Sequence, residues 1–112
     1  MKQITAVVKR DMLEPVARAI EEAGARGLTA TDVRGFGQEF GHMSSGRPAD
    51  QLAMVQPKLR IDVLVPDQLV DPVAEAIAKA VITGSIGDGK IWVCRVDSVV
   101  RVRTGERDDD AV

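Results

Sequence analysis

The residues of this chain best suited to chemistry lie near its C-terminus, in two groups separated by a short apolar segment. The first is the turn Gly87-Asp88-Gly89-Lys90, and the second is the pair Arg101 and Arg103. A glycine turn by itself commonly just closes a hairpin. Here, bare backbone N–H groups and one ammonium are followed by two guanidinium groups, which would share one face of an extended strand at 101–103. The combination predicts a site for the phosphates of a nucleotide.

Length, charge and composition restrict the class of protein. At 112 residues and a net charge of −2, we expect one domain without bulk attraction to nucleic acid or anionic lipid. The aromatic residues are Phe36, Phe40 and Trp92, too few for base stacking. Cys94 is the sole cysteine, which excludes a disulfide framework. Without a signal peptide or a transmembrane-length apolar run, we expect a cytoplasmic protein that meets a membrane only through a partner.

An internal repeat with an offset of 57 residues organises the chain. Residues 4–8 resemble residues 61–65, and residues 14–20 resemble residues 71–77. Self-similarity in one register across consecutive elements is hard to obtain by chance. The chain therefore reads as two copies of one β-α-β unit.

Hydrophobic periodicity and turn residues predict the elements of each copy. We expect a first helix with Asp11 as its N-cap and a second at about 68–81. Strands are expected at about 2–9, 28–33, 58–65 and 90–97. Two such units predict an α+β fold, a ferredoxin-like βαββαβ sandwich with both helices on one face of an antiparallel sheet. The other sheet face stays open, which usually indicates oligomerisation.

A long connection runs from about residue 35 to residue 56. It is polar and glycine-rich, and connections of that length are either functional or disordered. We favour the functional interpretation. Ser44 and Ser45 beside Arg47 are candidate phosphorylation sites, although exposed loop serines are also common without modification.

Several segments resemble, in order along the chain, the PII nitrogen-regulatory signal proteins. They are residues 33–37 (Val-Arg-Gly-Phe-Gly), Gly41-His42, Pro57-Lys58, 84–91 (Gly-Ser-Ile-Gly-Asp-Gly-Lys-Ile) and 101–106 (Arg-Val-Arg-Thr-Gly-Glu). The resemblance covers residues 1–112 and implies a homotrimer with nucleotide sites between subunits, where ATP and ADP compete. It also implies a protruding T-loop at about 37–55 that engages a target transporter or enzyme, and a C-terminal tail at about 104–112.

The resemblance further implies roles for individual residues. Thr29 and Leu64 would meet the adenine and ribose, and Arg101 and Arg103 would face the nucleotide from the neighbouring subunit. The full set of nucleotide-binding candidates is Thr29, Gly35, Gly37, Gln38, Leu64, Gly87, Asp88, Gly89, Lys90, Arg101 and Arg103.

Three positions in the T-loop depart from the family pattern. Gln38 replaces an arginine that reaches the γ-phosphate, and Gln51 replaces a tyrosine that is uridylylated in many relatives. Glu39 replaces a glutamine that touches Mg²⁺ beside 2-oxoglutarate, so it is the candidate Mg²⁺ ligand. Glu39, Gly41 and Lys58 are the candidate site for 2-oxoglutarate or another small anion. Because a carboxylate at position 39 would repel a dianion, we expect 2-oxoglutarate to bind weakly or not at all.

Two other classes of function stay open at this point. An enzyme would need a nucleophile–base pair or converging carboxylates, which the sequence does not show, so we expect no catalytic activity. A structural trimer, like the related copper-tolerance proteins, would explain the fold but not the grouping of Lys90, Arg101 and Arg103. We therefore expect a divergent PII-like protein that binds ATP or ADP and regulates a target in nitrogen or related metabolism.

Overall fold

The computed structural model describes residues 1–37 and 55–112. Within these ranges the elements follow in the order β-α-β-β-α-β, with short 3₁₀ turns before the second helix and at the C-terminus. The elements are β1 (Lys2–Lys9), α1 (Leu13–Glu22), β2 (Thr29–Gly35), β3 (Gln56–Val65), η2 (Asp67–Leu69), α3 (Val70–Val81), β4 (Gly89–Arg95) and η3 (Asp108–Ala111).

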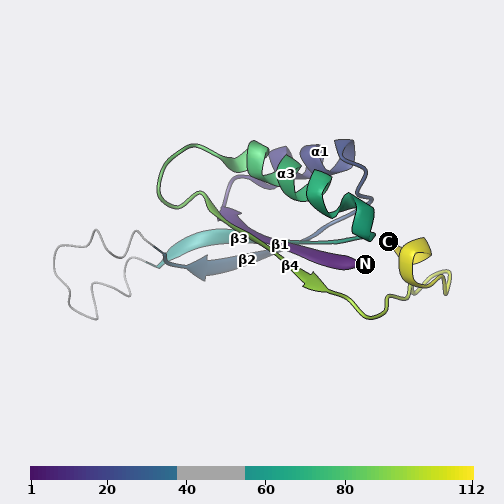
Figure 1. Cartoon of the computed structure of the whole chain (residues 1–112). Coiled ribbons are helices and arrows are strands. Elements are labelled where there is room, and N and C mark those ends of the chain that lie inside the picture. Colours follow the sequence, from purple (N-terminus) through teal and green to yellow (C-terminus); the bar gives the residue numbers. More distant parts are fainter. Residues whose placement is uncertain (38–54) are drawn as a thin grey trace.

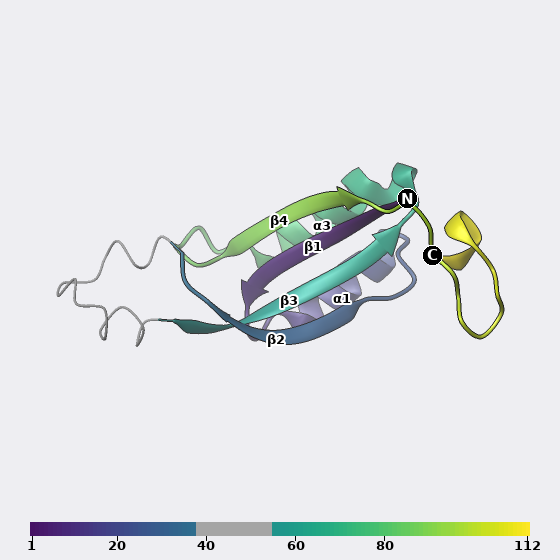
Figure 2. The same ribbon diagram turned by 90° about the horizontal axis from the view of Figure 1, so that it is seen from below.

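The four strands form one antiparallel sheet in the order β2-β3-β1-β4. Both helices cover one face of this sheet (Figure 1), and the opposite face is bare when the molecule is turned (Figure 2). This arrangement confirms the predicted α+β ferredoxin-like fold. None of the helices in the described ranges combines the length and apolarity needed to cross a membrane.

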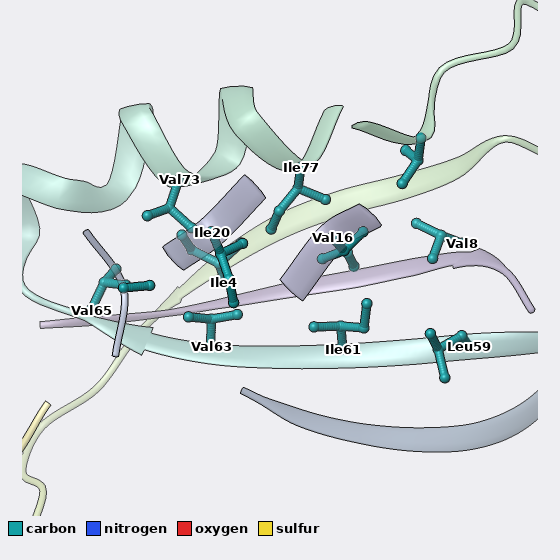
Figure 3. Close-up of a cluster of buried hydrophobic side chains, with 13 residues drawn as sticks. Ile4, Val8, Val16, Ile20, Leu59, Ile61, Val63, Val65, Val73 and Ile77 are labelled. Carbon is teal, nitrogen blue, oxygen red and sulfur yellow. The ribbon is translucent and has the colours of Figure 1, made fainter. Parts of the chain in front are cut away.

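The sequence repeat is also a repeat of the core (Figure 3). Ile4 and Val16 in the first copy, and Ile61 and Val73 in the second, are all fully buried. Ile4 and Ile61 are separated by the 57-residue offset, and so are Val16 and Val73. Burying one such side chain contributes about 1.5–3 kcal/mol, so the repeat preserves the contacts that hold the helices to the sheet.

The start of the first helix differs from the prediction. Its N-cap is Met12, which makes no side-chain capping hydrogen bond, so the prediction that Asp11 caps the helix is wrong. The chain leaves β1 through a tight turn in which the Met12 N–H donates to the Lys9 carbonyl at 3.2 Å. Asp11 lies inside this turn, one residue before the N-cap position.

Residues 101–103 also differ from the prediction, because they form a turn and not an extended strand. The Gly105 N–H donates to the Arg101 carbonyl at 2.8 Å, and the Arg101 N–H donates to the Glu106 carbonyl at 2.9 Å. Gly105 adopts a φ of 74°, which favours glycine and lets the chain reverse. The tail then ends in η3, with Ala111 and Val112 half-buried.

Candidate functional site

The first candidate site is an open cleft of about 420 Å³ at the end of the sheet where β2 stops. It brings together residues that the sequence predicted, from the end of β2, from β3 and from the loop before β4. Trp92 and Val7, which the sequence reasoning missed, form part of its wall. The predicted residues that line it are Gly35, Gly37, Lys58, Gly87, Asp88, Gly89 and Lys90.

The loop at residues 83–90 is held by the carboxylate of Asp88. One oxygen, Oδ2, accepts hydrogen bonds from the backbone N–H groups of Thr83 at 2.8 Å and Gly84 at 2.9 Å. The other, Oδ1, accepts from the Thr83 hydroxyl and lies 3.2 Å from the Lys9 ammonium. Hydrogen bonds from the Thr83 hydroxyl and backbone, with those from Lys9 and Gly84, hold the pKa of Asp88 well below its usual range.

All three glycines of this loop have backbone conformations that residues with side chains rarely adopt, and the first of them, Gly84, has a φ of 82°. Gly89 has a φ of 113°, and a Cβ there would lie 2.0 Å from the carbonyl oxygen of Val7 on β1. Gly87 has a φ of 97°. Glycine at position 89 therefore lets the loop close against β1, and glycine at position 87 lets its backbone turn into the cleft.

Basic side chains surround the same loop. The Lys58 ammonium donates to the Gly87 carbonyl at 3.3 Å. The exposed side chain of Lys90 makes no hydrogen bond or ion pair with any other residue in the described ranges. The cleft thus combines a glycine-rich backbone with positive charge, as an anion site requires.

The second candidate site lies at the other end of the sheet, near the tail. Its cleft of about 260 Å³ is lined by Thr29, Leu64 and Arg101, together with Asp62 and the C-terminal Val112. The Arg101 guanidinium forms an ion pair with Glu106 at 2.9 Å. Within one chain, the predicted nucleotide-binding residues are therefore divided between two separate clefts.

Asp62 is a site residue that the sequence reasoning missed. Its carboxylate accepts hydrogen bonds from the Thr5 hydroxyl at 2.7 Å, the Gln3 amide at 2.9 Å and Arg60 Nε at 3.1 Å. Although partial burial acts to raise it, these hydrogen bonds hold the pKa of Asp62 below its usual range. The Asp62 carboxylate is therefore an ionised hydrogen-bond acceptor beside Thr29, with which it pairs where β2 lies against β3.

The remaining predicted residues lie outside the described ranges. These are Gln38, Glu39, Gly41, Ser44 and Ser45, all in the predicted T-loop. Arg103 is described and exposed, in the turn beyond the second cleft. Elsewhere in residues 1–37 and 55–112, no three His, Cys, Asp or Glu side chains gather as metal ligands would.

Comparison with known proteins agrees with these motifs. The family model described as "Nitrogen regulatory protein P-II" matches residues 1–106. A Haemophilus influenzae protein named "Nitrogen regulatory protein P-II" and an Escherichia coli K12 protein named "Nitrogen regulatory protein P-II 1" are each 44% identical over 112 residues, all of both chains. An Azospirillum brasilense protein with the first name is 45% identical over the same length. The chain belongs to the P-II family of nitrogen regulatory proteins.

Proposed function

We propose that this protein is a trimeric P-II signalling protein that binds ATP and ADP between its subunits. The observation that carries the proposal is the division of the predicted site between two clefts. One chain would supply Gly35, Gly37 and the 83–90 loop. A neighbouring chain would supply Thr29 and Leu64 for the base and ribose, with Arg101 and Arg103 for the phosphates. The sequence placed only the two arginines on the neighbour, and the position of Thr29 and Leu64 beside Arg101 favours adding them.

The phosphate half of this site has the chemistry that a polyphosphate needs. Gly87 and Gly89 have no side chains of their own to cover the backbone, and Lys90 has a charge that no other described residue pairs. Arg103 likewise makes no ion pair within the described ranges. Charge-assisted hydrogen bonds from lysine and arginine to phosphate oxygens are among the strongest that proteins make.

The bare face of the sheet supports assembly with further copies. Leu64 and Trp92 are each 40% exposed there, although both are large and apolar. Cys94, on the same face of β4 as Trp92, is exposed as well. Packing three such faces together would remove this area from water, at about 25 cal/mol for each Å² of apolar surface.

The output of the protein would be regulation of a partner and not catalysis. The relatives above are named as regulatory proteins. We propose that residues 37–55 engage a target transporter or enzyme, with the bound nucleotide as the signal. Ser44 and Ser45 would be the candidate sites of covalent control, since no tyrosine is present for uridylylation.

Glu39 would bring Mg²⁺ to the nucleotide and would weaken binding of 2-oxoglutarate. Two like charges about 4 Å apart repel by about 4 kcal/mol at the effective dielectric of a protein surface. We expect no micromolar binding when 2-oxoglutarate is titrated into the Mg-ATP complex, and a gain of binding in Glu39→Gln. Tight binding by the wild type would contradict this part of the proposal.

Calorimetry with ATP and with ADP, together with native mass spectrometry, tests the main proposal. We expect a trimer that takes up one nucleotide at each interface. Lys90→Ala and Arg103→Ala should each lower the affinity for both ATP and ADP about ten- to a hundredfold, because each removes a charge-assisted contact. Lys79→Ala on α3 is the control, since it removes an exposed lysine that lines neither cleft. A trimer that binds neither nucleotide would instead support the purely structural alternative.

A further inference from the structure

Lys9, the last residue of β1, contacts the 83–90 loop at three points. Its ammonium lies 3.2 Å from Asp88 Oδ1, and it donates to the Thr83 hydroxyl at 3.2 Å and to the Ser85 hydroxyl at 3.0 Å. The side chain is about one third exposed, so this cluster lies at the surface, against the wall of the first cleft. We call the Lys9, Thr83, Ser85 and Asp88 side chains the Lys9–Asp88 clip.

Together with the Lys58 hydrogen bond to the Gly87 carbonyl, the clip holds a loop whose glycines give it little preference for one shape. Residues 83–90 include three glycines, which lose more backbone freedom on ordering than other residues. A loop that is disordered before binding must be ordered at the cost of affinity. The Asp88 hydrogen bonds to the Thr83 and Gly84 N–H groups fix one end of the loop, and Lys9 fixes it to β1.

The directions of these contacts also limit what Asp88 does. Both of its oxygens already accept hydrogen bonds from the loop, and Lys9 offsets its negative charge. It is therefore poorly suited to be a direct ligand of Mg²⁺ and repels a nearby phosphate less than an unpaired carboxylate would.

We propose that Lys9 and Asp88 are positioning residues, which hold the 83–90 loop in the shape that presents Gly87, Gly89 and Lys90 to the phosphates without touching them. This inference rests on the proposed nucleotide-binding function. The sequence had placed Asp88 among the residues that contact the nucleotide. In the proposed arrangement Asp88 supports the site without contacting the nucleotide, together with Lys9, which the sequence reasoning did not single out.

The test compares Lys9→Met, Asp88→Asn and the double variant with the wild type, and uses Lys79→Met on α3 as the matched control. Affinity is measured by calorimetry for ADP without Mg²⁺ and for ATP with Mg²⁺, after native mass spectrometry has shown that each variant keeps the wild-type assembly. Hydrogen exchange at the amides of Thr83 and Gly84 reports the loop itself, without any nucleotide.

In each single variant, the amides of Thr83 and Gly84 should exchange their hydrogens faster than in the wild type. The affinity for both nucleotides should fall about tenfold, which is the lower end of the losses seen when a group that supports a binding residue is removed. The double variant should be no worse than the poorer single one, because the two residues act as a unit. Lys9→Arg should keep most of the wild-type affinity, since it restores the cation.

Three results would overturn the inference while leaving the proposed function intact. They are a loss in Asp88→Asn confined to Mg-ATP, losses that add in the double variant, and faster exchange with unchanged affinity. If the wild type binds neither nucleotide, the proposed function fails and the inference fails with it.

Discussion

At the scale of single residues, charged side chains of this protein hold segments of its backbone in place. Asp88 closes the 83–90 loop, and Asp67 joins the start of β1 to the corner between β3 and α3. The Asp67 carboxylate lies 2.7 Å from both the Lys2 ammonium and the N-terminal ammonium. These contacts cross 65 and 66 residues of sequence, so no local pattern could have predicted them.

The Asp67 contacts predict a dependence of stability on pH. Hydrogen bonds from Lys2, and then from the N-terminal ammonium, lower the pKa of Asp67 to about 2. Because the folded pKa is below that of the unfolded chain, about 3.9, the stabilisation is present above pH 4. It is lost as the pH falls from about 4 to 2.

Thermal unfolding of the wild type and of Asp67→Asn, measured at matched concentrations from pH 6 to pH 2, checks this prediction. The midpoint of the wild type should exceed that of the variant at pH 6, and the gap should close towards pH 2. A gap that is constant across this range would contradict the assignment. High salt should narrow the gap at pH 6, because the Asp67 side chain is exposed to solvent.

At the scale of elements, the sequence predicted most of the fold because the hydrophobic period is strong on both helices and both central strands. The buried Val73, Ile77 and Val81 of α3 follow the helical spacing that the sequence shows. The prediction of a strand at 101–103 was wrong, because alternation of arginine and valine over three residues is too short to outweigh the turn at Gly105.

The candidate site was predicted where its residues are contiguous in sequence and missed where strand pairing assembles it. The 87–90 turn is a local motif. Val7 and Trp92 reach the first cleft from β1 and β4, and Asp62 meets Thr29 through pairing of β3 with β2. The usable signal for Asp62 was the alternation on β3, where Lys58, Arg60 and Asp62 fall on the face opposite the buried Leu59, Ile61 and Val63.

The join between the 83–90 loop and β4 predicts a strong effect of Gly89→Ala. A methyl group at this position would collide with the Val7 carbonyl, in a backbone conformation that L-residues avoid. We expect the free energy of unfolding to fall by about 3 kcal/mol, with weaker nucleotide binding as the loop moves away from β1.

Gly27→Ala is the matched control for this element. Gly27 lies before β2, its φ is not in the left-handed region, and no atom lies within 4 Å of a Cβ built there. Denaturant unfolding should therefore separate the two variants clearly. Equal stabilities of Gly89→Ala and Gly27→Ala would show that the loop does not approach β1 as described.

At the scale of the whole molecule, the bare sheet face is the feature that an isolated chain leaves unexplained (Figure 2). Cys94 provides a direct probe of it. The thiol is exposed in the single chain, and its neighbours across the sheet place it on the bare face. Assembly of three sheet faces would bury this thiol.

Thiol labelling therefore reports the assembly. In the native protein Cys94 should react with a thiol reagent at least about tenfold more slowly than in the denatured chain, because the proposed trimer would have to open before the reagent could reach the thiol. Dilution to concentrations at which mass spectrometry shows monomers should restore fast labelling. Equally fast reaction of the native trimer would place the assembly contacts elsewhere.

We propose that each nucleotide site is built from opposite ends of the sheets of two neighbouring chains. Mixed trimers test it most directly. Subunits with Lys90→Ala lack the first half of the site, and subunits with Arg103→Ala lack the second half. In every mixed trimer of a cyclic assembly, one interface then joins two intact halves, one is doubly defective, and one carries a single defect.

The measurement is native mass spectrometry of mass-labelled mixed trimers, at an ATP concentration too low for either parent variant to bind. We expect one tightly bound nucleotide in each mixed trimer and none in the trimers of either parent. Mixed trimers that bind no more nucleotide than the parents would show that the two clefts do not combine between chains.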